Sequence, residues 1–303
     1  SPVRHRAWRA FMAAAEAVGS RVALLRRNQV RRQRSLPPLL EQDLWPCRTM
    51  RRLTIGCTGV GLEFPDRAEM SPLFRMVGPS LPSDPEPLDE ELGAWIDART
   101  KPLVYVAFGT NHKHSEDTVA ELQGQLEGCD VSVIWALPEK QQKWLKPLPG
   151  EHWRVMNFAP QLSLLASGKI VAFVSHCGSN SLYESLLNGV PMVACPGGAD
   201  QPGNAVRIEA AGIGRIARGG LTGVQEALAE VVGSRQEYEA RCRQLCEVLA
   251  TQGGAGHAAT LIENAGRLGY NHMMPGAQRV SWSRITLGAT SAAAAVVLVC
   301  VFV

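Results

Sequence analysis

An apolar run that leads through a glycine turn into a helical pattern constrains this chain more than any other feature. Residues 169–176 read KIVAFVSH, residues 177–180 read CGSN, and residues 181–189, SLYESLLNG, have helical spacing. Backbone N–H groups at the start of a helix lack partners within the helix, and the helix dipole is positive there. The order of strand, glycine turn and helix therefore predicts a site for an anion such as a phosphate.

The same alternation of short apolar runs and helical stretches continues on both sides of this segment. Strands are expected at 102–108, 131–137, 153–158, 169–175, 191–195 and 214–217, and further helices from Ser115, at Leu162 and over 201–211, 222–251 (broken near Gly233) and 256–268. This order predicts an α/β fold, a Rossmann-like parallel sheet with helices on both faces. Ligands of such sheets bind beyond the carboxyl ends of the strands, where the FGTN, NFAP, SHCGSN and PGGAD segments fall.

The first hundred residues follow a different pattern. Residues 6–34 have helical spacing, and residues 52–57 resemble a strand. Residues 65–87 are rich in proline, and residues 88–99 have the spacing of a short amphipathic helix. A long proline-rich crossing is typical of a linker between two domains, so we place a domain boundary there.

The charge of the chain is small overall but unevenly distributed. The net charge is +3, whereas residues 1–52 hold twelve Arg, no Lys and three acidic residues. Such a basic block indicates nucleic acid, an anionic membrane surface, or a helix whose solvated arginine face lies against another domain. We adopt the third interpretation.

The eight cysteines have no paired spacing, so they predict neither a zinc site nor a disulfide framework, and the redox compartment stays open.

The two ends of the chain carry their own expectations. The chain starts at Ser1 without Met or an apolar leader-like stretch, which indicates that the natural N-terminus lies upstream. Residues 285–303 contain no charge and are just long enough to span a bilayer. We expect a membrane-anchoring helix there; the alternative is an apolar tail that packs on protein.

Several polar and glycine residues at the predicted strand ends have the right chemistry for a nucleotide sugar. Gly109 and Thr110 follow one strand, and Gly178 and Asn180 follow another, so the two loops could hold a diphosphate from two sides. His176 could donate to a phosphate oxygen, although a lone His at a strand end is more often structural. No GxGxxG motif follows the first strand of this region, which argues against a dinucleotide-binding oxidoreductase.

Four further residues complete this set, and each also has a plainer interpretation. Glu184 could accept from two ribose hydroxyls, or could simply complement the dipole in the first turn of a helix. Phe158 could stack on a base, or could belong to the core as most Phe residues do. Asp200 and Gln201 suit the hydroxyl groups of a sugar, and N-capping is the alternative for Asp200.

In combination, these segments resemble the donor-binding signature of the UDP-glycosyltransferase family, inverting enzymes with the two-Rossmann GT-B fold. The plant form begins with Trp-Ala-Pro-Gln, continues with His-Cys-Gly-Trp-Asn-Ser and Glu, and ends in Asp-Gln. Here Phe-Ala-Pro-Gln begins at 158, His-Cys-Gly-Ser-Asn-Ser begins at 176, Glu is residue 184, and Asp-Gln is 200–201, with no insertion. The segments LEFP at 62, VGP at 77 and KPLVYVAFGT at 101 resemble the linker and first strand of the family's C-terminal domain.

The resemblance implies a role for each matching residue. It implies that Phe158 stacks on the uracil, that the backbone around Gln161 bonds the edge of the uracil, and that Glu184 binds the ribose. The diphosphate would be held by Gly109, Thr110, His176, Gly178, Asn180 and Ser181, and the hexose by Asp200 and Gln201. Phe158 replaces the usual Trp, which implies weaker stacking, and Ser179 replaces the Trp of the plant form.

The resemblance also implies what this chain lacks. In the family the general base is a His, assisted by an Asp, near the start of the N-terminal domain, which forms most of the acceptor pocket. We assign neither His112 nor His114 as a base. The expected domains are 1–52, the end of an N-terminal acceptor domain; 53–100, an interdomain linker; 101–270, the UDP-sugar-binding domain and C-terminal half of a GT-B fold; and 285–303, a hydrophobic transmembrane helix.

The expected function is inverting transfer of a hexose, with glucose preferred, from a UDP-sugar to a hydroxyl of a lipophilic acceptor. The expected partners are the UDP-sugar, a lipid or other lipophilic molecule, and a membrane, with no metal, no cofactor beyond the donor and no nucleic acid. A single-pass protein of the endoplasmic reticulum or a similar membrane is expected, with the side of the membrane open. The alternatives are a donor-binding subunit or inactive half that needs a separate acceptor domain, and a nucleotide-sugar epimerase of the same fold.

Overall fold

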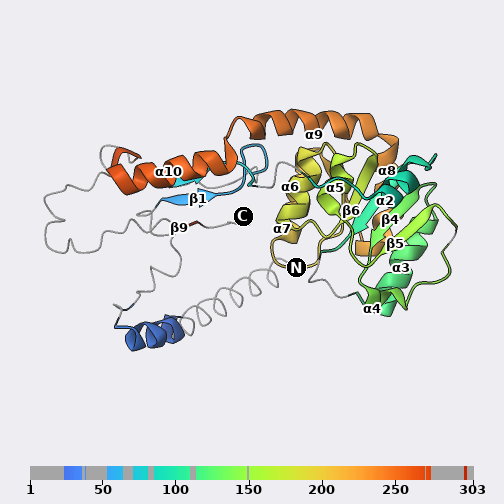
Figure 1. Cartoon of the computed structure of the whole chain (residues 1–303), viewed down its shortest axis with the longest axis horizontal. Helices are drawn as coiled ribbons and strands as arrows, with labels where there is room; N and C mark the ends of the chain where they lie inside the picture. The colour runs from blue at the N-terminus through green and yellow to red at the C-terminus, as the bar shows by residue number, and fades with distance from the viewer. Residues whose placement is uncertain are drawn as a thin grey trace, which may run out of the picture. The chain divides into compact units, whose positions relative to one another are not determined.

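The structure is a computed structural model, and it describes residues 24–35, 38, 53–63, 71–80, 85–109, 114–148, 150–269, 271–273 and 297–298. The chain divides into two compact units, which we describe separately. One unit contains the described residues within 57–63 and 76–257 and holds a large sheet (Figure 1). The other contains the described residues within 24–56, 71–75 and 258–298.

The large sheet has six strands, and every neighbouring pair is parallel. The spatial order is β5-β4-β3-β6-β7-β8. The strands are β3 (Leu103–Ala107), β4 (Ser132–Ala136), β5 (Trp153–Met156), β6 (Ile170–Ser175), β7 (Met192–Ala194) and β8 (Gly214–Ile216). The chain builds outward from β3 to β5 and then returns to place β6 on the other side of β3. The predicted parallel α/β sheet is confirmed, and its switch point lies between β3 and β6.

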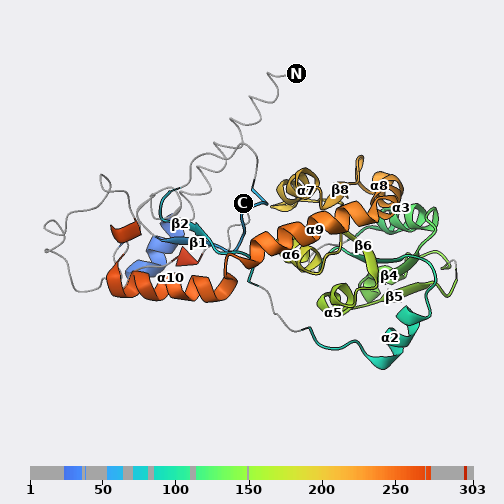
Figure 2. The ribbon, with the colours of Figure 1, turned by 90° about the horizontal axis from the view of Figure 1, so that it is seen from above.

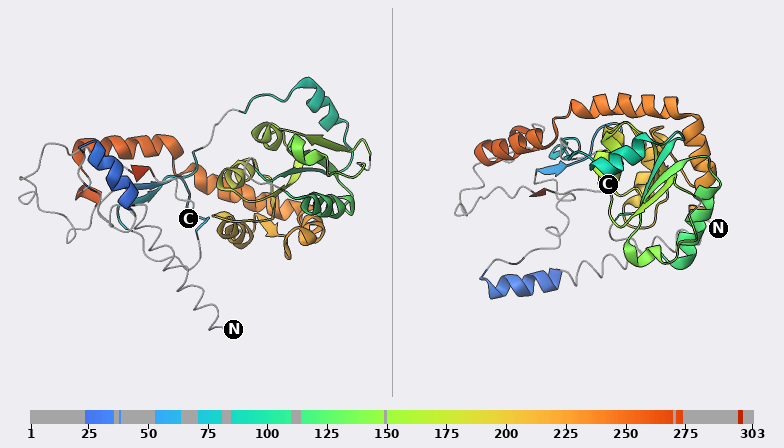
Figure 3. Two further views of the ribbon diagram at one scale, coloured as in Figure 1. Left: turned by 90° about the horizontal axis from the view of Figure 1, so that it is seen from below. Right: turned by 45° about the vertical axis from the view of Figure 1, so that its right-hand side comes forward.

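Helices cover both faces of this sheet, as predicted, because its strands are apolar on both sides. Along β3, Val104 and Val106 join a core with α3 (Glu116–Glu127) and α8 (Val224–Gly233). Leu103, Tyr105 and Ala107 point to the opposite core, which contains residues of the remaining principal helices (Figures 2 and 3). These are α2 (Glu90–Asp97), α5 (Gln161–Ala166), α6 (Ser179–Leu187), α7 (Gln201–Ala210) and α9 (Arg235–Ala250).

The helix boundaries follow local capping chemistry. α2 begins after Asp89, whose carboxylate accepts from Leu92 N at 2.7 Å, and α3 begins after Ser115, whose hydroxyl accepts from Thr118 N at 3.3 Å. The expected break near Gly233 is present, because Ser234 separates α8 from α9. A 3-10 turn, η3 (Gly220–Gly223), precedes α8. The short α4 (Glu139–Gln142) was not expected from the sequence.

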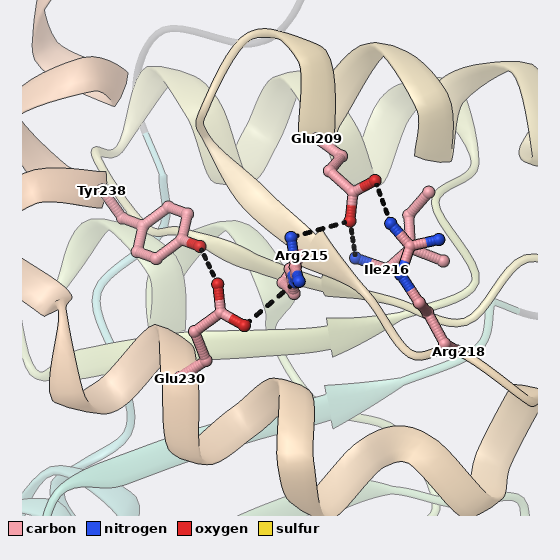
Figure 4. A network of polar contacts seen from close by, with 6 residues as sticks. All are labelled: Glu209, Arg215, Ile216, Arg218, Glu230 and Tyr238. Carbon is pink, nitrogen blue, oxygen red and sulfur yellow. Dashed lines mark hydrogen bonds and ion pairs between the residues drawn. The ribbon is translucent and has the colours of Figure 1, made fainter.

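A polar network ties the last strand of the sheet to three helices. Glu209 of α7 accepts from Ile216 N at 3.3 Å and pairs with Arg215 and Arg218 (Figure 4). Arg215 also pairs with Glu230 of α8 at 3.0 Å, and the hydroxyl of Tyr238 in α9 donates to Glu230 at 3.1 Å. These groups are partly solvated, so the ion pairs add little to the free energy of unfolding. Their main effect is to hold β8 in position at the edge of the sheet.

The other unit holds a small sheet with the order β2-β1-β9. Its strands are β1 (Thr54–Gly56), β2 (Phe74–Met76) and β9 (Val297–Leu298), and β1 pairs with β9 in parallel. Within the expected 6–34 helix, residues 24–33 are helical and the earlier part lies outside the described residues. α10 (Gly254–Leu268) and η4 (Asn271–Met273) complete the described elements.

The expected apolar helix over 285–303 falls largely outside the described residues. Val297 and Leu298, which are described, form β9 instead of helix and pair with Thr54 and Ile55. Branched apolar side chains suit a strand as well as a membrane helix, so composition alone did not separate the two. In the parts of the chain listed above, no helix combines the length and apolar character that a membrane crossing requires.

Candidate functional site

An open pocket of about 1040 Å³ lies at the carboxyl ends of the strands, next to the switch point between β3 and β6. Its wall is built from loops that follow five strands, and the segment 85–87 contributes as well. Of the eleven residues predicted for the donor site, ten line this pocket: Gly109, Phe158, Gln161, His176, Gly178, Asn180, Ser181, Glu184, Asp200 and Gln201. Thr110, the remaining one, lies outside the described residues. The predicted residues are therefore brought together in space.

The N-terminus of α6 forms one end of the pocket without a side-chain cap. Gly178 is the N-cap residue, the first helical bond runs from Leu182 N to Gly178 O, and the first turn holds no acidic residue. The leading N–H groups of α6 therefore keep the positive end of the helix dipole available to an anion. This geometry is the phosphate-binding arrangement expected from the sequence.

The imidazole of His176 fits closely between two glycines. A Cβ atom built on Gly109 would lie 2.9 Å from His176 Nε2, and one built on Gly178 would lie 2.6 Å from the same atom. Gly109 also has a φ of +72°, which glycine adopts without strain. A side chain at either glycine would therefore displace the histidine ring from its present position, and at Gly109 it would also strain the backbone.

Cys177 gives the turn after β6 a strained backbone. Its φ is +63°, an uncommon conformation for a residue with a Cβ, and its side chain is buried. Its N–H donates to Ser175 Oγ at 3.2 Å, and its carbonyl accepts from Asn204 Nδ2 at 2.8 Å. Burial raises the pKa of the Cys177 thiol to about 12, so the thiol stays protonated and acts as a small apolar group.

Glu184 and Gln161 form a polar pair on one wall of the pocket. Gln161 Nε2 donates to Glu184 Oε2 at 2.6 Å and to Ser181 Oγ at 3.2 Å, while the Tyr105 hydroxyl donates to Gln161 Oε1 at 3.4 Å. Burial and the charge of Glu184 raise the pKa of Tyr105, which keeps it a neutral donor. Glu184 stands in the second turn of α6, so the alternative of a first-turn dipole partner is wrong.

Phe158 is an exposed aromatic side chain on the pocket wall. It follows β5, and 74% of its surface is accessible, which excludes the alternative that it is a core residue. A ring in this position offers a flat apolar face to a ligand. Stacking on such a face is worth about 1–3 kcal/mol per base in nucleic-acid sites.

Asp200 and Gln201 line the pocket beside the first turn of α6. Asp200 is the N-cap residue of α7, as the alternative expected, but its side chain makes no capping bond. Its Oδ2 accepts from Ser179 Oγ at 2.9 Å and from Asn204 Nδ2 at 2.8 Å. Gln201 Oε1 accepts from Gly197 N at 2.8 Å and Gly198 N at 3.2 Å, which holds the loop before α7.

The structure gives no support to a histidine base in the loop after β3. His114 is buried, with 6% of its surface accessible, and its ring meets the edge of Phe108 at 4.7 Å between centroids. His112 lies outside the described residues. Among the residues that the structure describes, no cluster of three or more His, Cys, Asp or Glu side chains could hold a metal ion.

Sequence reasoning missed three contributions to the site. The side chain of Gln161, for which only the backbone was expected to act, reaches Glu184 and Ser181. Asn204 and Arg207 lie buried beneath Asp200. The signal for the last two was available, because they share the face of α7 that buries Ala205 and Ile208.

Comparison with known proteins agrees with this geometry. The family profile described as UDP-glucoronosyl and UDP-glucosyl transferase matches residues 52–252. The chain is 32% identical over 226 residues to the 2-hydroxyacylsphingosine 1-beta-galactosyltransferase of Rattus norvegicus, a match that covers 70% of this chain and 40% of that protein. It is 38% identical over 175 residues to a myricetin 3-O-rhamnosyltransferase of Crocosmia x crocosmiiflora, covering 52% and 38%. The chain thus spans less than half the length of these relatives.

Solved structures show the same fold. Os79 from O. sativa, in complex with UDP and deoxynivalenol-3-glucoside, superposes with a TM-score of 0.54 at 26% identity over 64% of this chain and 49% of its own. The glycotransferase of kitacinnamycin superposes with a TM-score of 0.66 at 22% identity over 90% of this chain and 67% of its own, a likeness of fold alone. With the profile match, the relatives and the pocket in agreement, the chain belongs to the UDP-glycosyltransferase family.

Proposed function

We propose that this chain carries the donor-binding part of an inverting glycosyltransferase that transfers a hexose from a UDP-sugar to a hydroxyl of a lipophilic acceptor. The observation that carries the proposal is the pocket at the switch point, which gathers ten of the eleven predicted donor residues. Family membership supports the same class of reaction.

Each part of the donor has a counterpart in the pocket. The uracil stacks on the exposed ring of Phe158, and the ribose hydroxyls donate to Glu184, with Gln161 beside it. The diphosphate faces the uncapped N-terminus of α6 together with His176. The hexose hydroxyls meet Asp200 and Gln201, which line the same pocket. We assign Thr110, Asn180 and Ser181 to the diphosphate as well.

The reaction is a single displacement at the anomeric carbon. The acceptor oxygen forms a bond to C1 as the bond from C1 to the diphosphate oxygen breaks, and the acceptor proton passes to a general base that we place in an acceptor domain. Negative charge develops on the departing diphosphate. The α6 N–H groups and His176 are positioned to stabilise that charge without reorganising, which lowers the barrier.

The chemistry of the wall favours a neutral hexose over a uronic acid. Glu86, Glu184 and Asp200 line the pocket, and its described lining residues include neither Lys nor Arg. The carboxylate of a uronic acid would therefore meet like charges. We propose glucose as the sugar; the curated relatives are named for galactose and rhamnose transfer, which makes those two donors the competitors to test.

The acceptor and membrane parts of the proposal rest on different grounds. A relative named for transfer to 2-hydroxyacylsphingosine favours a lipophilic hydroxyl as acceptor.

The uncharged 285–303 stretch favours membrane attachment, in the endoplasmic reticulum or a similar membrane. Membrane fractionation tests the second point: we expect the full chain to stay with membranes through a high-salt wash, and recovery in the supernatant would contradict the anchor.

A second candidate is a donor-binding subunit that acts only with a separate acceptor domain. It is favoured by the pocket, in whose described lining we assign no residue as a general base. In that case the chain binds UDP-sugars but does not transfer the sugar by itself.

Calorimetry with the full chain tests these proposals together. We expect binding of UDP and of UDP-glucose, weaker binding of UDP-glucuronate, and no binding of ADP-glucose at comparable concentration. Glucose transfer to a ceramide or a sterol by the chain alone would exclude the subunit candidate. Absence of any UDP binding would overturn the proposed function.

A further inference from the structure

A buried polar pair, Asn204 and Arg207, lies beneath the pocket, and Asn204 contacts the lining residues Ser179 and Asp200 directly. Asn204 has 1% and Arg207 6% of their surfaces accessible. Both come from α7, one turn apart, and neither is among the lining residues of the pocket. Burying an amide and a guanidinium is costly unless their hydrogen bonds are made, so their partners show what they do.

The partners fix the orientation of the Asn204 amide. Arg207 Nη2 donates to Asn204 Oδ1 at 2.5 Å. A guanidinium can only donate, so the amide oxygen must face it, and the amide nitrogen must face the opposite way. The two amide hydrogens match two contacts of 2.8 Å, one to Cys177 O and one to Asp200 Oδ2. The Ser179 Oγ atom, at 3.3 Å, is a third and weaker acceptor.

These contacts determine how Asp200 is presented to a ligand. Its Oδ2 atom accepts from Asn204 and also from Ser179 Oγ at 2.9 Å. One carboxylate oxygen is therefore occupied by the protein, whereas among the described residues no hydrogen bond is made to the Oδ1 atom of Asp200, a residue that lines the pocket. Two donors on a single oxygen fix the plane of the carboxylate, which gives it a defined direction toward a sugar hydroxyl.

The same amide supports the strained turn at the diphosphate end. Cys177 has a φ of +63°, and conformations of this kind persist only where surrounding contacts enforce them. The bond from Asn204 to the Cys177 carbonyl is one such contact. Asn204 thus joins the loop after β6 to the loop after β7, which in sequence are more than twenty residues apart.

We propose that Asn204 and Arg207 are positioning residues that couple the hexose end of the donor pocket to its diphosphate end. Arg207 fixes the amide of Asn204, and that amide holds Asp200 and the Cys177 turn in one arrangement before any ligand arrives. The assignment to hexose and diphosphate rests on the proposed function. The coupling of the two loops rests on the hydrogen bonds alone.

Hydrogen–deuterium exchange of the unliganded full chain tests the coupling. Arg207→Met removes the donor to Asn204, and Asn204→Asp keeps an oxygen for Arg207 but replaces the amide donor with an oxygen that faces two acceptors. We expect faster exchange in peptides covering 176–181 and 196–201 for both variants, and recovery toward the native rate in Arg207→Lys. Arg218→Met, which removes an exposed ion pair with Glu209, is the matched control. Unchanged exchange in either loop for Asn204→Asp, with the β3 and β6 peptides protected as in the native chain, would overturn the inference.

Calorimetry then separates positioning from general destabilisation. We expect Asn204→Asp and Arg207→Met to weaken UDP-glucose binding roughly tenfold, as the loss of a hydrogen bond to a charged group would, and to weaken UDP binding less. An equal loss for both ligands would contradict the assignment to the hexose end. If the native chain binds neither ligand, the proposed function fails, while the exchange experiment still decides the coupling.

Discussion

β3 and β6 lie side by side in the sheet and each is followed by a helix, yet the two helices begin in opposite ways. α3 is capped by its own Ser115 and carries Glu116 and Asp117 in its first turn. α6 starts at Gly178 with no side-chain cap and no acid in its first turn. The first helix caps and neutralises its own N-terminus, whereas the second has neither a cap nor an acid of its own. The carboxylate beside it is that of Asp200, which accepts from Ser179 Oγ.

At the same edge of the sheet, the N-terminus of α3 contributes to stability, whereas we propose that the N-terminus of α6 contributes to binding. A side-chain cap contributes about 1 kcal/mol to the free energy of unfolding, and acidic residues in the first turn add a few tenths. α6 forgoes both contributions, and its leading N–H groups face the pocket where we propose that the diphosphate binds. The four variants below are ordered by the size of the effect that we expect.

Giving α6 the kind of acidic cap that α2 has should weaken donor binding the most. Gly178→Asp places a carboxylate beside the diphosphate subsite and a Cβ atom against His176, so we expect UDP affinity to fall by about 3 kcal/mol, roughly a hundredfold. Titration calorimetry measures the change. Ser115→Asp puts the same carboxylate on α3 and should leave UDP affinity unaltered; native affinity in Gly178→Asp would show that α6 is not the anion site.

Removing the carboxylate from the second turn of α6 should have the next largest effect. Glu184→Ala is expected to weaken UDP binding by about 2 kcal/mol, since two hydroxyl donors lose a charged acceptor. Glu116→Ala on α3 is the matched control and should not change affinity. If UDP affinity is the same in Glu184→Ala, the ribose assignment is wrong, whatever happens to the stability of the variant.

Phe158 tests the wall of the pocket instead of its charged end. Phe158→Ala should cost about 1.5 kcal/mol in UDP affinity through lost stacking, and Phe158→Trp should recover or exceed the native value. Pyrophosphate binding, which needs no base contact, should be equal in all three proteins. A parallel loss of pyrophosphate affinity would mean that the variant disturbs the loop and would remove Phe158 from the base subsite.

The smallest effect is expected for α3, which caps its own N-terminus. Ser115→Ala is expected to lower the free energy of unfolding by about 1 kcal/mol, because Thr118 N loses its acceptor. Denaturant unfolding measures this value, and UDP affinity should be unaffected. A loss of UDP affinity without a loss of stability would show that the N-terminus of α3 takes part in binding, contrary to the roles proposed for the two helices.

The local patterns were sufficient to predict most elements of the sheet unit. Helix starts at Ser115 and Gln201 were both anticipated, and the helices begin at or within one residue of these positions, because helical periodicity depends on neighbours in sequence. β2, within the proline-rich 65–87 stretch, was not anticipated, since a three-residue strand depends on pairing with a distant partner.

The candidate site shows the same limit at the level of side chains. The signature spacing identified which residues line the pocket, but it did not indicate that Asp200 is held from below by Asn204 or that Gln161 reaches Glu184. Such contacts cross from one strand loop to another. They depend on the sheet order, which no periodicity along the chain encodes.

The exposed ring of Phe158 has a calorimetric consequence. With 74% of its surface in water, the ring gives up hydrated apolar area when a base covers it. Loss of such area lowers the heat capacity of the system, so the enthalpy of UDP binding should become more negative as the temperature rises. The slope should be shallower for pyrophosphate, which leaves the ring wet. The Phe158 side chain would then determine how the enthalpy of UDP binding changes with temperature, although most contacts with UDP are polar.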